Sequence, residues 1–114
     1  MTEVVPSVED RFSRILSAIK VVQVELRGCS EKELANDRMR RLALERLFEI
    51  ISIASDHIPN EIKTAEPTVD WRCLADIGVR LENTRDRIEP EVLWNMALEK
   101  IVPLKVCAER HIRA

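Results

Sequence analysis

The side chains best suited to chemistry lie in one charged segment, residues 80–87, which reads Arg-Leu-Glu-Asn-Thr-Arg-Asp-Arg. Guanidinium groups stay protonated at neutral pH and can hold a phosphate bidentately. Arg85 and Arg87 are therefore candidates for binding a phosphate group, with Asn83 beside them, although alternating charges are also typical of a solvated turn. Arg80 and Arg85 can converge only if a helix breaks between them, because five residues of helix rotate by about 140°.

Two tryptophans, the only two in the chain, bracket this charged segment at positions 71 and 94. We interpret Trp71 and Trp94 as large core anchors that hold the turn between them, in preference to platforms for stacking RNA bases. Arg80 lies four residues after Asp76, so an ion pair on a helix surface is the alternative to a catalytic role for this arginine.

Four pieces of sequence around this segment carry a family resemblance. They are Pro-x-x-x-Trp at residues 67–71, Gly-x-Arg at 78–80, an acidic residue before Leu-Trp at 91–94, and Val-Pro-Leu at 102–104. In this order and spacing, residues 41–104 resemble the HepT family, small helical proteins of the HEPN superfamily. Members are usually ribonuclease toxins paired with an MNT-type minimal nucleotidyltransferase antitoxin.

The chain departs from the active motif of that family. The motif is Arg-Asn, three further residues, His, one residue, and Tyr. Here Arg80 keeps the arginine, whereas the Asn, His and Tyr positions hold Leu81, Arg85 and Arg87. Tyrosine is absent from the chain, and neither histidine lies four to six residues after an arginine. The Gly-Glu-Ala piece of the family's second helix reads Ser-Ile-Ala at residues 52–54, so that acid is missing too.

The resemblance implies a metal-independent endoribonuclease without a cofactor. The motif histidine would exchange a proton with the ribose 2′-hydroxyl, and Arg80 would be the catalytic residue that stabilises charge on the phosphate. An arginine at position 85 cannot exchange that proton, and losing a positioned acid–base group typically costs about 10²–10⁴ in rate. We therefore expect weak or no cleavage. In the family, an antitoxin can silence its toxin by adenylylating the motif tyrosine. This chain contains no tyrosine, so it cannot be silenced in that way.

A different class of function competes with a weakened nuclease. The resemblance also fits a non-catalytic interaction module, a dimer that binds its nucleotidyltransferase partner or RNA without cutting. A homodimer is expected from the family in either case, with the motifs of the two copies facing each other. The resemblance implies that Arg80 faces a polar groove shared by the two copies, and the retained arginine favours some surviving use of that groove. The lost histidine and tyrosine favour binding over cutting.

Composition indicates one cytoplasmic globular domain over residues 1–114. Hydrophobic residues make up 46% and charged residues 33%, and no apolar run approaches the length of a membrane span. The net charge of −2 provides no overall basic field for RNA. The three cysteines at positions 29, 73 and 107 are far apart and form no recognised metal spacing with the histidines, so reduced thiols and no metal site are expected.

The hydrophobic periodicity predicts an all-α protein, and the resemblance specifies an up-and-down four-helix bundle with short extra helices in its connections. Two glycines leave little material for the turns of a sheet. The first helix should begin after Ser7 and end near Gly28, with a strand-like stretch at 21–24. A capping box at 30–33 starts a short helix, and a long central helix runs from Arg38 to Pro59 with Met39 on its apolar stripe.

The second half of the chain should hold two further helices. Residues 60–66 are expected to be a connection, and Asp70 caps the next helix. The last helix begins at Pro90 and should kink at Pro103, because proline removes a hydrogen bond from a helix interior. We treat His111, near its end, as structural or exposed.

A basic group on the central helix has two interpretations. Its members are Arg38, Arg40, Arg41 and Arg46. They could form a lane for the RNA backbone, or a solvated face in which Glu45 and Glu49 lie within pairing distance. The negative net charge favours the solvated face.

Overall fold

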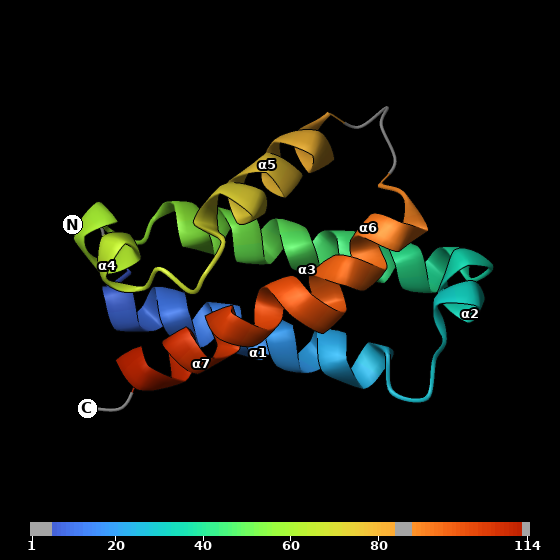
Figure 1. Cartoon of the computed structure of the whole chain (residues 1–114), viewed down its shortest axis with the longest axis horizontal. Coiled ribbons are helices and arrows are strands. Elements are labelled where there is room, and N and C mark those ends of the chain that lie inside the picture. Colours follow the sequence, from blue (N-terminus) through green and yellow to red (C-terminus); the bar gives the residue numbers. More distant parts are fainter. Residues whose placement is uncertain (1–5, 84–87, 113–114) are drawn as a thin grey trace, which may run out of the picture.

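The computed structural model describes residues 6–83 and 88–112, and every regular element in these ranges is helical. The elements are α1 (Val8–Glu25), α2 (Glu31–Ala35), α3 (Arg38–Asp56), α4 (Asn60–Ala65), α5 (Trp71–Glu82), α6 (Pro90–Asn95), a π turn η1 (Met96–Lys100) and α7 (Ile101–His111). Helices α1, α3 and α7 follow the long axis, α5 lies against α3, and the short helices α2 and α4 lie at opposite ends (Figure 1). The all-helical prediction is confirmed for the described residues.

Side-chain caps fix where the helices begin. Ser7 and Ser30 each form a reciprocal capping box, with Asp10 and Glu33, at the start of α1 and α2. These caps satisfy backbone N–H groups that have no partner within the helix. Asp70 accepts a hydrogen bond from the Cys73 N–H and caps α5. The predicted caps are confirmed at all three helices.

The core lies between α1, α3 and α7, and α3 is its central member. Helix α3 packs against α1 on one side and α5 on another, as the apolar sequence predicts. The largest fully buried side chains are Phe12, Phe48, Ile15, Ile19, Leu34, Leu44, Ile51, Leu74, Leu93, Met96, Ile101 and Leu104. The prediction for Met39 is wrong, since it is 76% exposed. It lies five residues before Leu44, which places it about 140° away from the buried face.

Two connections differ from the expectation. Residues 60–65, expected as an irregular connection, form the short helix α4. In the last helical run, Pro90 occupies the first turn as predicted, but the irregularity lies one turn before Pro103. There the Ile101 N–H reaches back to the carbonyl of Met96, five residues earlier. The run stays helical through Pro103, because a widened turn suits a residue that has no N–H to donate.

Gly78 is required by the close packing of α5 on α3. A Cβ added there would lie 1.9 Å from the Ser52 Oγ and 2.9 Å from the Ser52 Cβ. Overpacking of this kind costs about 1–3 kcal/mol, against which alanine gains about 1 kcal/mol in helix propensity. We therefore expect Gly78→Ala to lower the free energy of unfolding, measured by urea denaturation. Combining it with Ser52→Ala should recover part of the loss, and Val79→Ala, on the exposed side of α5, serves as the control.

Candidate functional site

Arg80, the candidate catalytic residue, lies in the last turn of α5 and faces the start of α6. Its Nη2 donates to both carboxylate oxygens of Glu89, at 2.9 Å and 3.0 Å. Glu89 directly precedes α6, so this ion pair joins the two ends of the charged turn. The contact holds the pKa of Glu89 below its ordinary value. Arg80 thus forms an ion pair with Glu89 across the turn, whereas the sequence predicted one with Asp76 on the same helix.

The other predicted phosphate-binding residues belong to the turn itself. Arg85 and Arg87 lie outside the described residues. Asn83 is exposed and ends α5, where its N–H donates to the Arg80 carbonyl at 3.2 Å. The helix therefore ends between Arg80 and Arg85, and the break that their convergence requires is present.

A small hollow of about 180 Å³ lies between Leu81, at the end of α5, and the first half of α3. Its lining residues are Leu42, Glu45, Arg46, Glu49 and Leu81. Leu81 occupies the position of the motif asparagine, so an aliphatic side chain replaces a polar amide at the wall of this hollow. Arg46 is paired with Glu49 on the opposite wall. The hollow therefore offers one arginine to a phosphate, and that arginine already has a carboxylate partner.

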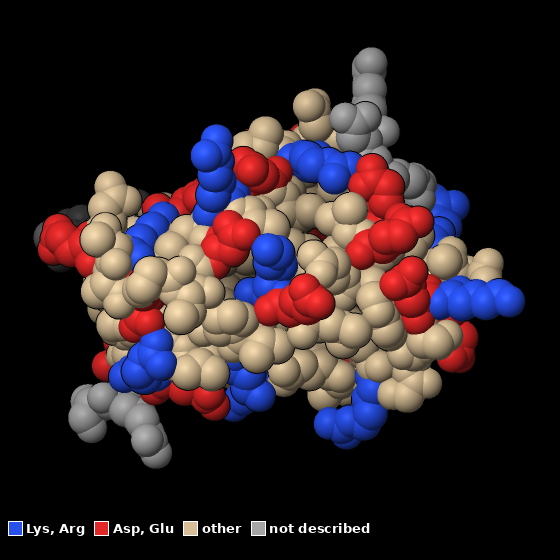
Figure 2. All heavy atoms as spheres, in the orientation of Figure 1, with Lys and Arg blue, Asp and Glu red and all other residues tan. Residues whose placement is uncertain are grey.

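The basic group on α3 is mostly engaged within the protein. Arg40 pairs with Asp37 at 3.7 Å and donates to the Cys29 Sγ at 3.1 Å, while Arg41 donates to the Leu34 and Ala35 carbonyls that end α2. On the face shown in Figure 2, Lys and Arg side chains are interspersed with Asp and Glu side chains. These contacts within the protein and the mixed surface charges favour the interpretation as a solvated face over a lane for the RNA backbone.

The two tryptophans are half-buried and pack against the core. The Trp71 Nε1 donates to the Glu66 carbonyl at 3.2 Å, and the Lys63 Nζ lies 5.7 Å from the centroid of its ring. Trp71 therefore fixes the loop that leads into α5. Both tryptophans pack on the core as the anchor interpretation predicts, whereas their hold on the turn between them stays a prediction.

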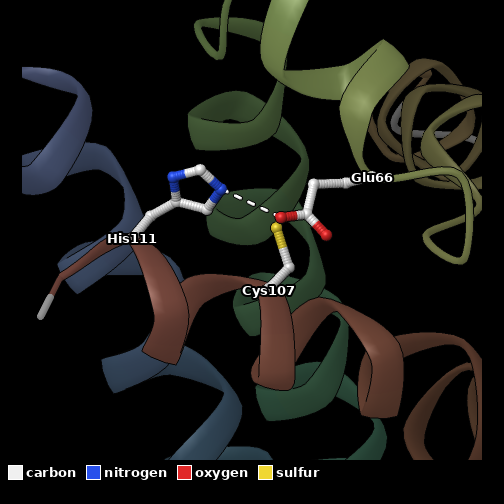
Figure 3. Close-up of side chains that lie close together, drawn as sticks. All are labelled: Glu66, Cys107 and His111. Atoms are coloured by element: carbon white, nitrogen blue, oxygen red, sulfur yellow. Dashed lines mark hydrogen bonds and ion pairs between the residues drawn. The ribbon is translucent and has the colours of Figure 1, made fainter.

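A second group of reactive side chains lies at the other end of α5, and sequence reasoning missed it. Glu66, from the loop before α5, meets Cys107 and His111 of α7 (Figure 3). One ligand-type atom from each lies within 4.8 Å of the others. The signal in the sequence was the i, i+4 spacing of Cys107 and His111, which places both on one helix face. The third member is distant in the chain and could not be found by spacing.

Glu66 is the buried charge in this group. Its carboxylate accepts hydrogen bonds from Arg110 and, at 3.0 Å, from the His111 Nε2. The hydrogen bond from Arg110 is the main cause that holds the pKa of Glu66 below its ordinary value of 4.5. The His111 ring also stacks on Phe12 of α1, with centroids 4.7 Å apart. Together these contacts tie the end of α7 to the loop and to α1.

The lowered pKa of Glu66 predicts a loss of stability in acid. A carboxylate whose pKa is lower in the folded state stabilises the fold above its unfolded pKa, and that contribution disappears as the pH falls through the folded value. We expect the free energy of unfolding, measured in urea, to fall below about pH 4.5 less steeply in Glu66→Gln than in the parent. Glu109→Gln, on the exposed side of α7, should keep the parental slope. Equal slopes in all three proteins would contradict the assignment.

Comparison with known proteins places the chain in a family. The sequence model of a family described as "Ribonuclease HepT-like" matches residues 15–111. A curated protein of Thermococcus cleftensis, "Probable ribonuclease HepT", is 30% identical over 97 residues, which cover 85% of this chain and 88% of that protein. No solved structure matches the chain significantly. No helix among the described residues is long and apolar enough to cross a membrane. The family match over most of its length shows that this chain belongs to the HepT-like ribonuclease family.

Proposed function

We propose that this protein is the toxin-side member of a toxin–antitoxin pair whose RNA cleavage is weak or absent. Its scaffold is a single cytoplasmic domain over residues 1–114, an up-and-down four-helix bundle of the HEPN kind. The partner is an MNT-type nucleotidyltransferase, and no cofactor takes part. The observation that carries the proposal is the surroundings of Arg80, where the retained arginine faces a carboxylate and neither histidine of the chain is near.

The positions of the two histidines support this proposal. His111 contacts Glu66, which precedes α5, whereas Arg80 lies nine residues beyond the start of α5, about 14 Å along its axis. His57 ends α3, and Ser52 of α3 lies against Gly78 of α5. From that contact the antiparallel helices carry His57 and Arg80 in opposite directions (Figure 1). Within one copy of the chain, neither histidine therefore lies beside Arg80, where the motif histidine would be needed.

Glu89 does not supply the missing chemistry either. Its carboxylate is beside Arg80, but the ion pair lowers the pKa of Glu89. A general base works best when its pKa lies near the working pH, so lowering the pKa of a carboxylate makes it a weaker base. A phosphate bound at Arg80 would share the guanidinium with this carboxylate, whose negative charge repels it. Both effects favour a low rate of cleavage.

The competing proposal, a dimeric interaction module, has one observation in its favour. Leu98, Val102 and Val106 follow one another at four-residue spacing through η1 and α7, and each is about half exposed. Exposed apolar side chains in a row are typical of protein-protein contact surfaces. We propose that this apolar stripe, residues 98, 102 and 106, contributes to a homodimer or to the nucleotidyltransferase contact.

RNA cleavage by the purified protein tests the first proposal. The parent and Arg80→Ala would be incubated with total RNA, with and without a chelator, beside Arg72→Ala as an exposed arginine control on α5. We expect little cleavage by any of them. Vigorous cleavage by the parent and Arg72→Ala that survives the chelator and disappears in Arg80→Ala would show an intact nuclease and contradict the proposed weakness.

Sedimentation tests the contact surface. Val102→Glu should weaken self-association or copurification with a coexpressed MNT-type nucleotidyltransferase, because it places a charge in the apolar stripe. Val24→Glu, at an exposed valine of α1, is the matched control. If the parent protein is a monomer and does not copurify with the nucleotidyltransferase, the interaction module has no support.

A further inference from the structure

Glu66, Cys107 and His111 present three different ligand atoms to one point. The Cys107 Sγ and the His111 Nε2 come from successive turns of α7, and a Glu66 carboxylate oxygen reaches them from the loop before α5 (Figure 3). In a tetrahedral zinc site with bonds of about 2.0–2.3 Å, ligand atoms lie roughly 3.3–3.6 Å apart. The three ligand atoms lie within 4.8 Å of one another. They would therefore have to approach by at most about 1.5 Å to reach that geometry, a distance that side-chain rotation can supply.

We propose that these three side chains bind a zinc-type divalent cation, with water as the fourth ligand. A thiolate, an imidazole and a carboxylate form a donor set of intermediate softness that favours zinc or cobalt over magnesium and calcium. The site is independent of RNA cleavage, because Arg80 lies at the opposite end of α5. Its role would be structural, since it joins the last helix to the loop that leads into α5.

Surrounding residues already hold two of the ligands in place. Arg110 donates to the Glu66 Oε1, which leaves Oε2 directed at His111. Metal-bound carboxylates usually keep such a hydrogen bond on their second oxygen, so Arg110 can stay where it is. The His111 ring is stacked nearly parallel on Phe12, at 12°, which fixes the direction of its nitrogen. Metal binding would replace the hydrogen bond between Oε2 and Nε2 with two bonds to the cation.

The proton balance of binding is defined by the thiol. Cys107 is fully buried, and burial, together with the nearby Glu66 carboxylate, raises the pKa of its thiol to about 12. Binding therefore requires the cation to displace the Cys107 proton to solvent as the bond to Sγ forms. The Nε2 proton that is donated to Glu66 must also leave to solvent, so that Nε2 binds through its lone pair while Nδ1 carries the one N–H of the neutral ring. The affinity should consequently rise with pH. If Glu66 only formed its ion pair with Arg110 and no metal bound, there would be no pH-dependent release of the Cys107 proton.

Cobalt titration of the purified, chelator-treated protein tests the proposal. Co²⁺ bound to a thiolate gives a charge-transfer band in the near ultraviolet, and competition by Zn²⁺ removes it. We expect one equivalent of Co²⁺ to bind, with Zn²⁺ tighter than about 1 μM and Mg²⁺ without effect. Cys107→Ala should abolish the band and His111→Gln should weaken Zn²⁺ binding at least about 10-fold. The cobalt band and Zn²⁺ binding should both be retained in the control variants Cys29→Ala, Cys73→Ala and His57→Gln.

The parent protein alone can overturn the proposal, whatever the stability of the variants. No cobalt band and no Zn²⁺ binding at 100-fold higher concentration than the expected dissociation constant would reject the site. A band retained in Cys107→Ala but lost in Cys29→Ala or Cys73→Ala would assign the metal elsewhere and reject it as well. Glu66→Gln is the variant that tests the third ligand, because glutamine keeps the shape of the side chain. Circular dichroism checks that each variant is folded.

Discussion

Replacing Arg85 with histidine is expected to raise RNA cleavage by about 10²–10⁴-fold over the parent. A histidine has a pKa near 6.5, so it can accept and donate a proton at neutral pH, whereas arginine stays protonated. A positioned acid–base group typically contributes a factor of this size. Helix α5 ends at Glu82, so the helix break that the motif requires lies between Arg80 and position 85. Single-turnover cleavage of a labelled RNA measures the effect.

The specificity of this gain can be checked in the same experiment. Arg80→Ala combined with Arg85→His should return the rate to the parental value, because the phosphate then loses its stabilising charge. Adding Arg87→Tyr completes a second position of the family motif and should not lower the rate. Arg87→His, which places an imidazole two residues away, is the matched control. If Arg85→His and the control are equally inactive, the remaining differences from the motif, such as Leu81, also prevent catalysis.

Phe48→Ala is expected to cause the largest loss of stability among single substitutions, about 3–5 kcal/mol of unfolding free energy. Phe48 is 1% exposed and lies in the middle of α3, the helix that contacts both α1 and α5. Removing its ring takes away apolar burial and leaves a cavity that the surrounding helices can close only in part. Small domains have about 5–15 kcal/mol in total, so the variant should be marginal at 37 °C.

Urea denaturation followed by circular dichroism measures this loss. Ile53→Ala, on the exposed side of the same helix, should change the unfolding free energy by less than about 1 kcal/mol. The comparison separates the cavity from any effect on the helix itself, because both variants place alanine in α3. A similar change in the two variants would mean that Phe48 is not a centre of the core.

Much of the fold could be predicted because it depends on local chemistry. Ser7, Ser30 and Asp70 cap helices through residues three positions away, and such patterns are contained in a few consecutive letters. The apolar positions Leu93, Ile101 and Leu104 are buried as their spacing predicts. The prediction for Met39 was wrong because a wide apolar stripe does not show which of its sides is covered, and Met39 lies about 140° around α3 from the buried Leu44.

The site was predictable only in part, because its partners are distant in the chain. The family resemblance located Arg80, but its pairing with Glu89 depends on how α6 returns after the turn. The Glu66 group was missed for the same reason, since Glu66 and Cys107 are 41 positions apart and meet only through tertiary packing. Spacing rules find ligands within one element and say nothing of a third residue from another.

The π turn before Pro103 has a consequence for how this chain tolerates deletions. A π turn is an α-helix that has accommodated one inserted residue, so α6 and α7 keep nearly the relative rotation of a continuous helix. Removing one residue from Met96–Lys100, together with Pro103→Ala, should restore an uninterrupted α-helix with both ends in place. Removing one residue after Ile101 would instead turn Cys107 and His111 by about 100°, away from Glu66. Two deletions a few positions apart thus have opposite outcomes.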